Sequence, residues 1–150
     1  MHSGIYILGL RLMTYHEYTR TQVRTSTHID KHQKIITAKP GQKSVTLPCR
    51  APNNSSSISV VEWSRADLRD EYVLLYRDDL FDPTNQDPSF KNRVDLQDRQ
   101  MKDGDVSLIL KDVTINDNGT YVCQCRVVQG VRQPMKLIST INLSVDPPGE

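Results

Sequence analysis

Three cysteines carry the most reactive side chains of this 150-residue chain: Cys49, Cys123 and Cys125. Three thiols permit one disulfide and leave one thiol over. The last of the four histidines is His32, so the remainder of the chain has none. A histidine-based catalytic triad or a Cys/His zinc site in that remainder is therefore almost excluded, because the general base or the ligands are missing.

Acidic side chains gather at Asp78-Asp79 and again at Asp103 and Asp105, and carboxylates are ligands that calcium takes in proteins. Their spacing lacks the twelve-residue loop that a closing glutamate completes, and acidic residues are common in turns. We interpret both clusters as turns. No nucleophile and base can be assembled into a pocket from these residues, so the sequence predicts a protein that is not an enzyme and binds no metal or cofactor.

Charge and composition limit the partners. The chain has 19 basic and 18 acidic residues, interspersed, and a formal net charge of +1. This balance gives no long-range field toward phosphate groups, so nucleic acid is not an expected partner, and nothing indicates a small-molecule substrate. A hydrophobic content of 37% is compatible with a folded core, and no stretch approaches the roughly 20 apolar residues of a membrane span.

Residues 1–33 differ from the rest of the chain. The apolar run GIYILGL is interrupted at Arg11, and a polar segment rich in Thr and Arg follows without clear periodicity. A secretory signal has a basic start, an uninterrupted apolar middle and a small-residue cleavage site, and only fragments of that pattern are present. We therefore expect residues 1–33 to be a leader or a disordered N-terminal segment, residues 34–146 to form one domain, and residues 147–150 to begin a linker.

From residue 35 onward, apolar residues mostly alternate with polar ones, which is the period of a strand with one buried face. Turn-rich pieces such as residues 82–89 and 116–119 separate the strands. Several short strands punctuated in this way predict an antiparallel β-sandwich. The inward positions expected from the alternation are Val45, Leu47, Cys49, Val61, Trp63, Leu108, Leu110, Val113, Tyr121, Cys123, Cys125, Ile141, Leu143 and Val145.

The order and spacing of Cys49, Trp63 and Cys123 form the strongest motif of the chain. Counted from the first cysteine, the tryptophan stands at position +14 and the second cysteine at position +74. The run that ends at Cys123 reads DNGTYVC, which has the form D-x-G-x-Y-x-C. Together these motifs resemble the variable-set (V-type) immunoglobulin superfamily over residues 34–146. The resemblance implies an all-β fold, a two-sheet antiparallel immunoglobulin V-type sandwich with one inter-sheet disulfide.

For the cysteines, the resemblance implies a disulfide between Cys49 and Cys123, with the indole of Trp63 packed on it. Closing a loop of this length stabilises a fold by roughly 4 kcal/mol on the chain-entropy model. Cys125 has the same inward parity as Cys123, and three explanations remain open for it. They are a semi-buried free thiol, a bridge to another chain, and an alternative partner for Cys49; the first is favoured because unpaired cysteine is among the most buried residue types.

The resemblance also assigns roles around the second cysteine. It places Tyr121 in a tyrosine corner, with Gly119 permitting a tight backbone before it. Arg93, in the run KNRVDL, matches the arginine that this family pairs with an aspartate across the bottom of the sandwich, here Asp117. Two solvated charges are the alternative, since surface pairs contribute only about 0–1 kcal/mol.

Within the superfamily, four runs look most like butyrophilin-type and costimulatory-ligand domains: VTLPCR, VEWSR, VLLYRD and DVSLILKDVTINDNGTYVC. Adhesion receptors of the coxsackievirus–adenovirus receptor type are close in pattern as well. Antibody and T-cell-receptor variable domains carry a glycine-containing bulge in their last strand. Residues 136–145 contain no glycine, which argues against a rearranging antigen receptor.

Four Asn-x-Ser/Thr sequons are candidate glycosylation sites: Asn53, Asn54, Asn118 and Asn142. One such match means little in a chain rich in Ser, Thr and Asn, but four beside an expected disulfide favour an extracellular protein. Crowding is expected to allow a single glycan at the adjacent pair. Asn142 is expected to point outward, because its neighbours Ile141 and Leu143 point inward.

We expect the partner to bind the outward side of the strands near residues 60–64, 72–77, 122–126 and 136–145. Aromatic residues and arginine are enriched at protein interfaces, although an ordinary solvated position is the alternative for any single residue. Residues 52–57 and 127–134 form loops at one end that are further candidates. The expected partner-binding residues are Glu62, Tyr72, Tyr76, Val122, Gln124 and Arg126, with Val60 and Ser64 beside them.

These features favour an extracellular recognition domain of an immune-regulatory protein, similar to butyrophilin-like or costimulatory ligands. It would bind a protein receptor or ligand on another cell and modulate T-cell signalling, either from the external side of the plasma membrane or as a secreted protein. The alternative is a homophilic or heterophilic cell-adhesion module similar to the coxsackievirus–adenovirus receptor type, for which self-association is expected. Both functions use the same sandwich, so the fold does not choose between them.

Overall fold

The computed structural model describes residues 5–8, 11–14, 33–52 and 57–147, and the chain divides into two units, residues 1–33 and 34–150. In the first unit, strands β1 (Ile5–Leu8) and β2 (Arg11–Thr14) pair antiparallel. A leader or disordered N-terminal segment over residues 1–33 stays a prediction. The run IYIL is rich in residues that favour strands. The other residues before Gln33 lie outside the described residues, as do residues 148–150.

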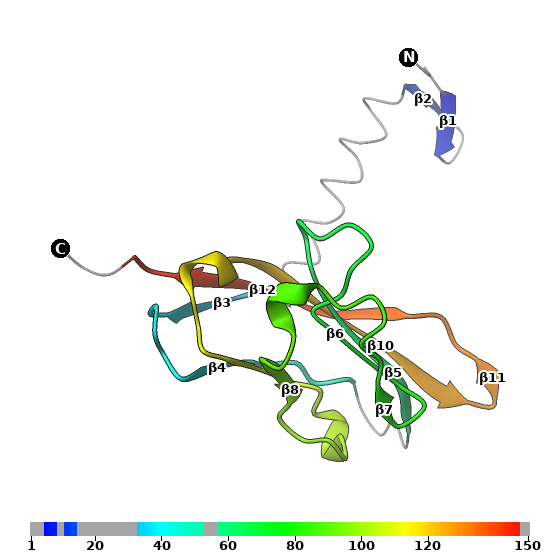
Figure 1. Ribbon diagram of the computed structural model, residues 1–150. Coiled ribbons are helices and arrows are strands. Elements are labelled where there is room, and N and C mark those ends of the chain that lie inside the picture. The colour runs from blue at the N-terminus through cyan, green and yellow to red at the C-terminus, as the bar shows by residue number, and fades with distance from the viewer. Residues whose placement is uncertain (1–4, 9–10, 15–32, 53–56, 148–150) are drawn as a thin grey trace. The chain divides into compact units, whose positions relative to one another are not determined.

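Two sheets form the second unit (Figure 1). The larger sheet has the strand order β3–β12–β10–β5–β6–β7, with β11 paired to β10, and the smaller sheet has the order β4–β9–β8. The larger sheet contains β3 (Gln33–Ala38), β5 (Ile58–Arg65), β6 (Leu74–Arg77), β7 (Leu80–Phe81), β10 (Gly119–Gln129), β11 (Val131–Arg132) and β12 (Lys136–Val145). The smaller sheet contains β4 (Ser44–Leu47), β8 (Val94–Leu96) and β9 (Leu108–Lys111).

Short 3₁₀ turns complete the connections: η2 (Pro88–Phe90), η3 (Lys102–Gly104) and η4 (Ile115–Asp117). Within the described part of the chain there is no α-helix, and hence no helix long and apolar enough to cross a membrane. All strand pairs with a described register run antiparallel. The prediction of an all-β, two-sheet immunoglobulin sandwich is confirmed.

Alternating side chains fill the space between the sheets. On β10, Tyr121, Cys123 and Cys125 are at most 1% exposed, and on β12 Ile141 and Leu143 are at most 2% exposed. Full burial of an aliphatic side chain contributes roughly 1.5–3 kcal/mol, so this alternation fixes which face of each strand turns inward. The intervening residues of both strands therefore lie on the opposite side of the larger sheet.

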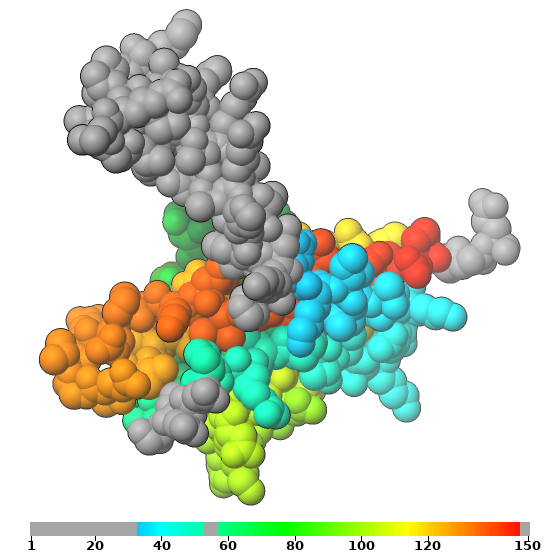
Figure 2. All heavy atoms as spheres, turned by 180° about the vertical axis from the view of Figure 1, so that it is seen from behind, coloured from blue at the N-terminus to red at the C-terminus, as the bar shows by residue number. Residues whose placement is uncertain are grey.

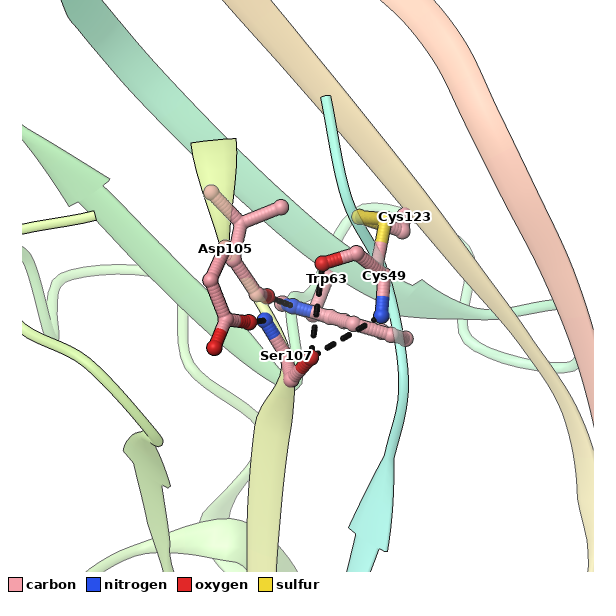
Figure 3. Close-up of a disulfide and its surroundings, with 6 residues drawn as sticks. Cys49, Trp63, Asp105, Ser107 and Cys123 are labelled. Carbon is pink, nitrogen blue, oxygen red and sulfur yellow. Dashed lines mark hydrogen bonds between the residues drawn. A yellow bond between two sulfur atoms is a disulfide. The ribbon is translucent and has the colours of Figure 1, made fainter. Parts of the chain in front are cut away.

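The disulfide joins Cys49, just after β4, to Cys123 on β10, and the predicted pairing is confirmed. Trp63 lies opposite Cys123 on the neighbouring strand β5 and is fully buried beside the bridge (Figure 3). Its indole Nε1 donates a hydrogen bond of 2.9 Å to the carbonyl oxygen of Val106, which links the two sheets. The hydroxyl of Ser107 accepts from the amide of Cys49 at 3.1 Å and donates back to its carbonyl at 3.3 Å, so the backbone beside the disulfide is held in place.

A second buried cluster closes the other end of the sandwich around Asp117. Arg93 contacts its carboxylate with both terminal nitrogens, at 3.2 and 2.5 Å, and the Asp117 side chain is only 3% exposed. The hydroxyl of Tyr121 donates to the carbonyl oxygen of Asp117 at 2.6 Å, which is the tyrosine corner. At position 119 a glycine is favoured by a close approach of the Arg65 side chain, in addition to the tight backbone that we expected. A Cβ at this position would lie 2.9 Å from the Cδ of Arg65.

Candidate protein-binding face

The outer face is the outward side of strands β12, β10, β5 and β6. Along its middle, Gln124 on β10 lies opposite Glu62 on β5, and Glu62 lies opposite Leu75 on β6. Each of these three side chains is half-buried by its neighbours on the sheet. Val122, predicted as a binding residue, takes the next outward position on β10. The middle of the outer face therefore has two polar side chains, Gln124 and Glu62, next to the apolar Leu75 and Val122.

Glu62 is the acidic group at the centre of the outer face. Desolvation by burial raises the pKa of its carboxyl above the ordinary value of 4.5. Among the described residues its side chain has no ion-pair or hydrogen-bond partner. A carboxylate that is partly dehydrated without compensation is stabilised when a cationic group reaches it, so this position favours a basic partner group.

Arg126 lies one outward position along β10, opposite Val60, and Val60 lies opposite Arg77 on β6. The Nε of Arg126 is buried and has no hydrogen-bond partner in the described part of the chain. The great majority of buried polar groups form hydrogen bonds, so a buried guanidinium nitrogen without an acceptor is unusual and marks this position as a candidate for function. Arg77 differs, because it pairs with Asp82 at 2.6 Å.

One of the two predicted tyrosines, Tyr76, does not lie on the outer face, whereas the predicted role of Tyr72 stays a prediction. Tyr76 is 9% exposed and belongs to the core, where its ring packs edge-on against Phe81 at 5.3 Å between centroids. The register of β6 against β5 sets this, because Tyr76 lies opposite the inward Val61. Tyr72 precedes β6 and is half-buried; its backbone amide donates to the carbonyl oxygen of Asn85 at 2.8 Å. The outward positions of β6 are Leu75 and Arg77, which the sequence analysis missed.

The β10–β11 hairpin projects from one end of the sandwich, as the orange segment of Figure 2 shows. Behind it lies a cavity of about 310 Å³ whose lining includes Val127, Met135, Ile138 and the thiol-bearing Cys125. Cys125 is free and buried, and its burial raises the pKa of the thiol to about 12. The tip of the hairpin falls within residues 127–134, which we predicted as a binding loop. In the other predicted loop, residues 52–57, residues 53–56 lie outside the described residues.

Two of the four sequons can be placed. Asn142 is half-buried and outward on β12, and its Oδ1 accepts a 2.6 Å hydrogen bond from the hydroxyl of Thr120. Asn118 is exposed, and its Oδ1 accepts from the amide of Val145 at 2.9 Å. In both residues the hydrogen bond is accepted by the side-chain oxygen. The side-chain nitrogen, which would carry a glycan, does not take part in this hydrogen bond. Asn53 and Asn54 lie outside the described residues.

Side chains that could ligate a metal do not gather in the part of the chain that the structure describes. No group of three or more His, Cys, Asp or Glu side chains is close enough there to hold a metal ion. The acidic pair Asp78-Asp79 forms the two-residue turn between β6 and β7, and both residues have a positive φ, 53° and 62°. These are the values of the tight turns that join hairpin strands, so the acidic residues belong to a turn as interpreted.

Comparison with known proteins identifies the family, since residues 33–146 match the Immunoglobulin V-set domain. The chain belongs to the immunoglobulin V-set family. Its relatives include the CD276 antigen homolog of Xenopus laevis, 31% identical over 88 residues, and the human protein named junctional adhesion molecule-like, 39% identical over 83 residues. These matches cover 54% and 55% of this chain but only 27% and 20% of the relatives, so the chain spans about a quarter or less of their length.

Among solved structures, the fold is similar to that of bovine butyrophilin, with a TM-score of 0.61 at 24% identity. The match covers 77% of this chain and 52% of the butyrophilin chain. At this identity the likeness concerns the fold. The predicted resemblance to butyrophilin-like and costimulatory-ligand proteins is confirmed at the level of the family.

Proposed function

We propose that this domain is an extracellular protein-recognition module, not an enzyme, and that it binds a receptor or ligand on another cell through the outer face. The observation that carries the proposal is the pair of uncompensated groups at the centre of that face. Glu62 is partly dehydrated without a cationic partner, and the Nε of Arg126 is buried without an acceptor among the described residues. A cationic group of a protein partner would compensate Glu62, and an acidic group would pair with the guanidinium of Arg126, whose side chain as a whole is only half-buried.

An extracellular location is supported by two features. A disulfide between the sheets forms and persists in an oxidising compartment. The sequons at Asn118 and Asn142 leave their side-chain nitrogens out of the hydrogen bonds described above. The protein acts either at the external side of the plasma membrane or as a secreted form.

The finer role is that of an immune-regulatory protein of the butyrophilin-like or costimulatory kind, which modulates T-cell signalling. Its support is the family membership together with a relative named CD276 antigen homolog. A cell-adhesion module is the second candidate, and the relative named junctional adhesion molecule-like favours it. Both roles use a protein partner and predict the same dependence on the outer face.

The test is a binding titration of the fluorescently labelled full chain against a panel of immune and epithelial cells. The double variant Glu62→Arg with Arg126→Glu reverses both central charges and keeps the net charge. We expect it to bind at least about tenfold more weakly, because like charges then face the partner's groups. Binding to immune cells supports the regulatory role, and binding to epithelial cells supports adhesion.

The matched control is Lys111→Glu with Asp146→Lys, which also reverses one charge of each sign at exposed positions, one at the end of β9 in the smaller sheet and one beyond the end of β12. Melting curves for both double variants establish that they are folded. The control, at exposed positions, is expected to change stability by less than about 0.5 kcal/mol. Equal cell binding by a folded outer-face variant and the control contradicts the proposed face. Residues 127–134 would then be the next site to test.

A further inference from the structure

Two hairpins leave the larger sheet at the same end, where β5 begins (Figure 1). The start of β5 is paired on one side with the late part of β10, since Ile58 lies opposite Val127. On its other side it is paired with the end of β6, since Val60 lies opposite Arg77. The β10–β11 turn and the β6–β7 turn therefore project in the same direction from opposite sides of one strand.

The β10–β11 hairpin is basic and apolar. Residues 127–137 read VVQGVRQPMKL and include no acidic residue. Arg132 and Lys136 are exposed, and among the described residues neither forms an ion pair. Val128 and Val131 are 52% and 78% exposed, although they are aliphatic. Exposed apolar side chains beside unpaired cations are typical of a binding surface for an acidic, partly apolar partner.

The β6–β7 hairpin has the opposite charge and the same apolar character. Its turn residues Asp78 and Asp79 form no ion pair within the described ranges, whereas the neighbouring Arg77 is paired with Asp82. Leu80 is 71% exposed beside them. The two-residue turn holds both aspartates in left-handed backbone conformations, so the carboxylates project from a fixed framework.

From this complementarity we infer that a second copy of this chain binds at the two hairpins. The basic hairpin of one copy contacts the acidic hairpin of the other. A twofold axis then produces the same contact twice, which is the condition for a closed dimer with a self-complementary interface. The net charge of +1 gives no general attraction between copies, so the attraction comes from the local separation of charge on each copy.

The short turns favour this contact because they are already shaped for it. Gly130, at the tip of the basic hairpin, has a φ of 62°, and the acidic turn has positive φ at both positions. Little backbone order has to be imposed on binding, which lowers the entropic cost of a small interface. The inference rests on the protein-binding role proposed above, but it uses none of the central outer-face residues.

Charge swapping between copies tests the inference by sedimentation velocity of the full chain. The first variant is Asp78→Lys with Asp79→Lys, and the second is Arg132→Glu with Lys136→Glu. We expect the unchanged chain to form a dimer that weakens as salt is added, and each variant alone to associate at least about tenfold more weakly. In an equimolar mixture of the two variants, one contact keeps its original signs and the other has them reversed. Both contacts are then attractive, so the mixture forms a heterodimer.

The matched control is Asp70→Lys with Asp146→Lys, which changes the charge by the same amount at exposed positions away from both hairpins, and it is expected to dimerise normally. A chain that stays monomeric up to about 100 μM overturns the inference. So do variants that dimerise as well as the unchanged chain, and a mixture of folded variants that stays monomeric. Loss of cell binding in the Glu62 and Arg126 variant with dimerisation intact separates the two proposals, as does cell binding by a strictly monomeric chain.

Discussion

Removing the indole of Trp63 is expected to cost a large part of the stability of the domain. The side chain is fully buried, and truncation of a buried tryptophan to alanine costs about 3–5 kcal/mol. It also leaves the buried carbonyl of Val106 without its donor, a loss of about 1–3 kcal/mol. Water entering the cavity recovers part of the second loss, so we expect about 4–5 kcal/mol for Trp63→Ala out of a typical 5–15 kcal/mol.

Urea unfolding followed by far-UV circular dichroism measures this loss. Trp63 is the only tryptophan, so intrinsic fluorescence does not compare the variant with the parent. The disulfide stays oxidised throughout, because its loss alone removes about 4 kcal/mol on the chain-entropy model. The slope of free energy against urea concentration must match between proteins, since a changed slope reports a different unfolded or native state.

A second substitution separates packing from hydrogen bonding. Trp63→Phe keeps most of the aromatic burial and loses the N–H donor, so we expect a loss of about 1–3 kcal/mol. Ser64→Ala, on the same strand but facing outward, is the control and should stay within about 0.5 kcal/mol of the parent. A Trp63→Ala loss below about 1 kcal/mol would refute the packing argument, and equal losses for the alanine and phenylalanine variants would assign the whole effect to the hydrogen bond.

Two further predictions concern buried polar groups. Burial raises the pKa of the Cys125 thiol from 9.0 to about 12, so a thiol reagent at pH 8 should label it only after unfolding. As the pH rises, the thiol ionises first in the unfolded protein, so the free energy of unfolding falls between about pH 9 and pH 12. The fall is expected to be less steep in Cys125→Ala. Labelling of the folded protein as fast as that of the unfolded protein would contradict the burial of the thiol. Arg93→Ala should cost about 3–5 kcal/mol in urea unfolding, because it leaves the carboxylate of Asp117 buried and unpaired. The control Arg99→Ala removes an arginine 67% exposed and should cost less than about 1 kcal/mol, and equal losses would contradict the burial argument.

The alternation of apolar residues located most of the core from the sequence. In residues 121–125 of β10 and 141–145 of β12, every second residue is apolar or cysteine and three of the four intervening residues are polar, so the inward face of these segments could be read from the sequence. The bond from Cys49 to Cys123 and the contact of Arg93 with Asp117 came from motif spacing within a recognised family. These positions are fixed by the sandwich itself, and that is why a pattern in one sequence was enough to find them.

The prediction failed at β6 because that strand has no alternation to follow. Residues 73–76 read VLLY, and any assignment of inward and outward faces fits such a run. Pairing with β5 decides the matter, since Leu74 lies opposite Trp63 and Tyr76 opposite Val61. Tyr76, expected on the outer face, therefore lies in the core, and Leu75 and Arg77 take the outward positions of β6. Non-local pairing of this kind is not encoded in a local pattern.

The position of Cys125 decides among the three explanations left open for it. Cys49 is bonded to Cys123, so it is not available as a partner, and Cys125 is itself only 1% exposed. Its side chain is buried on the inner side of the larger sheet, so a bridge to another chain would require the core to open at that point. The hairpin contact between copies requires no such opening. Association through the hairpins should therefore persist unchanged in Cys125→Ala, whereas a covalent dimer would be lost.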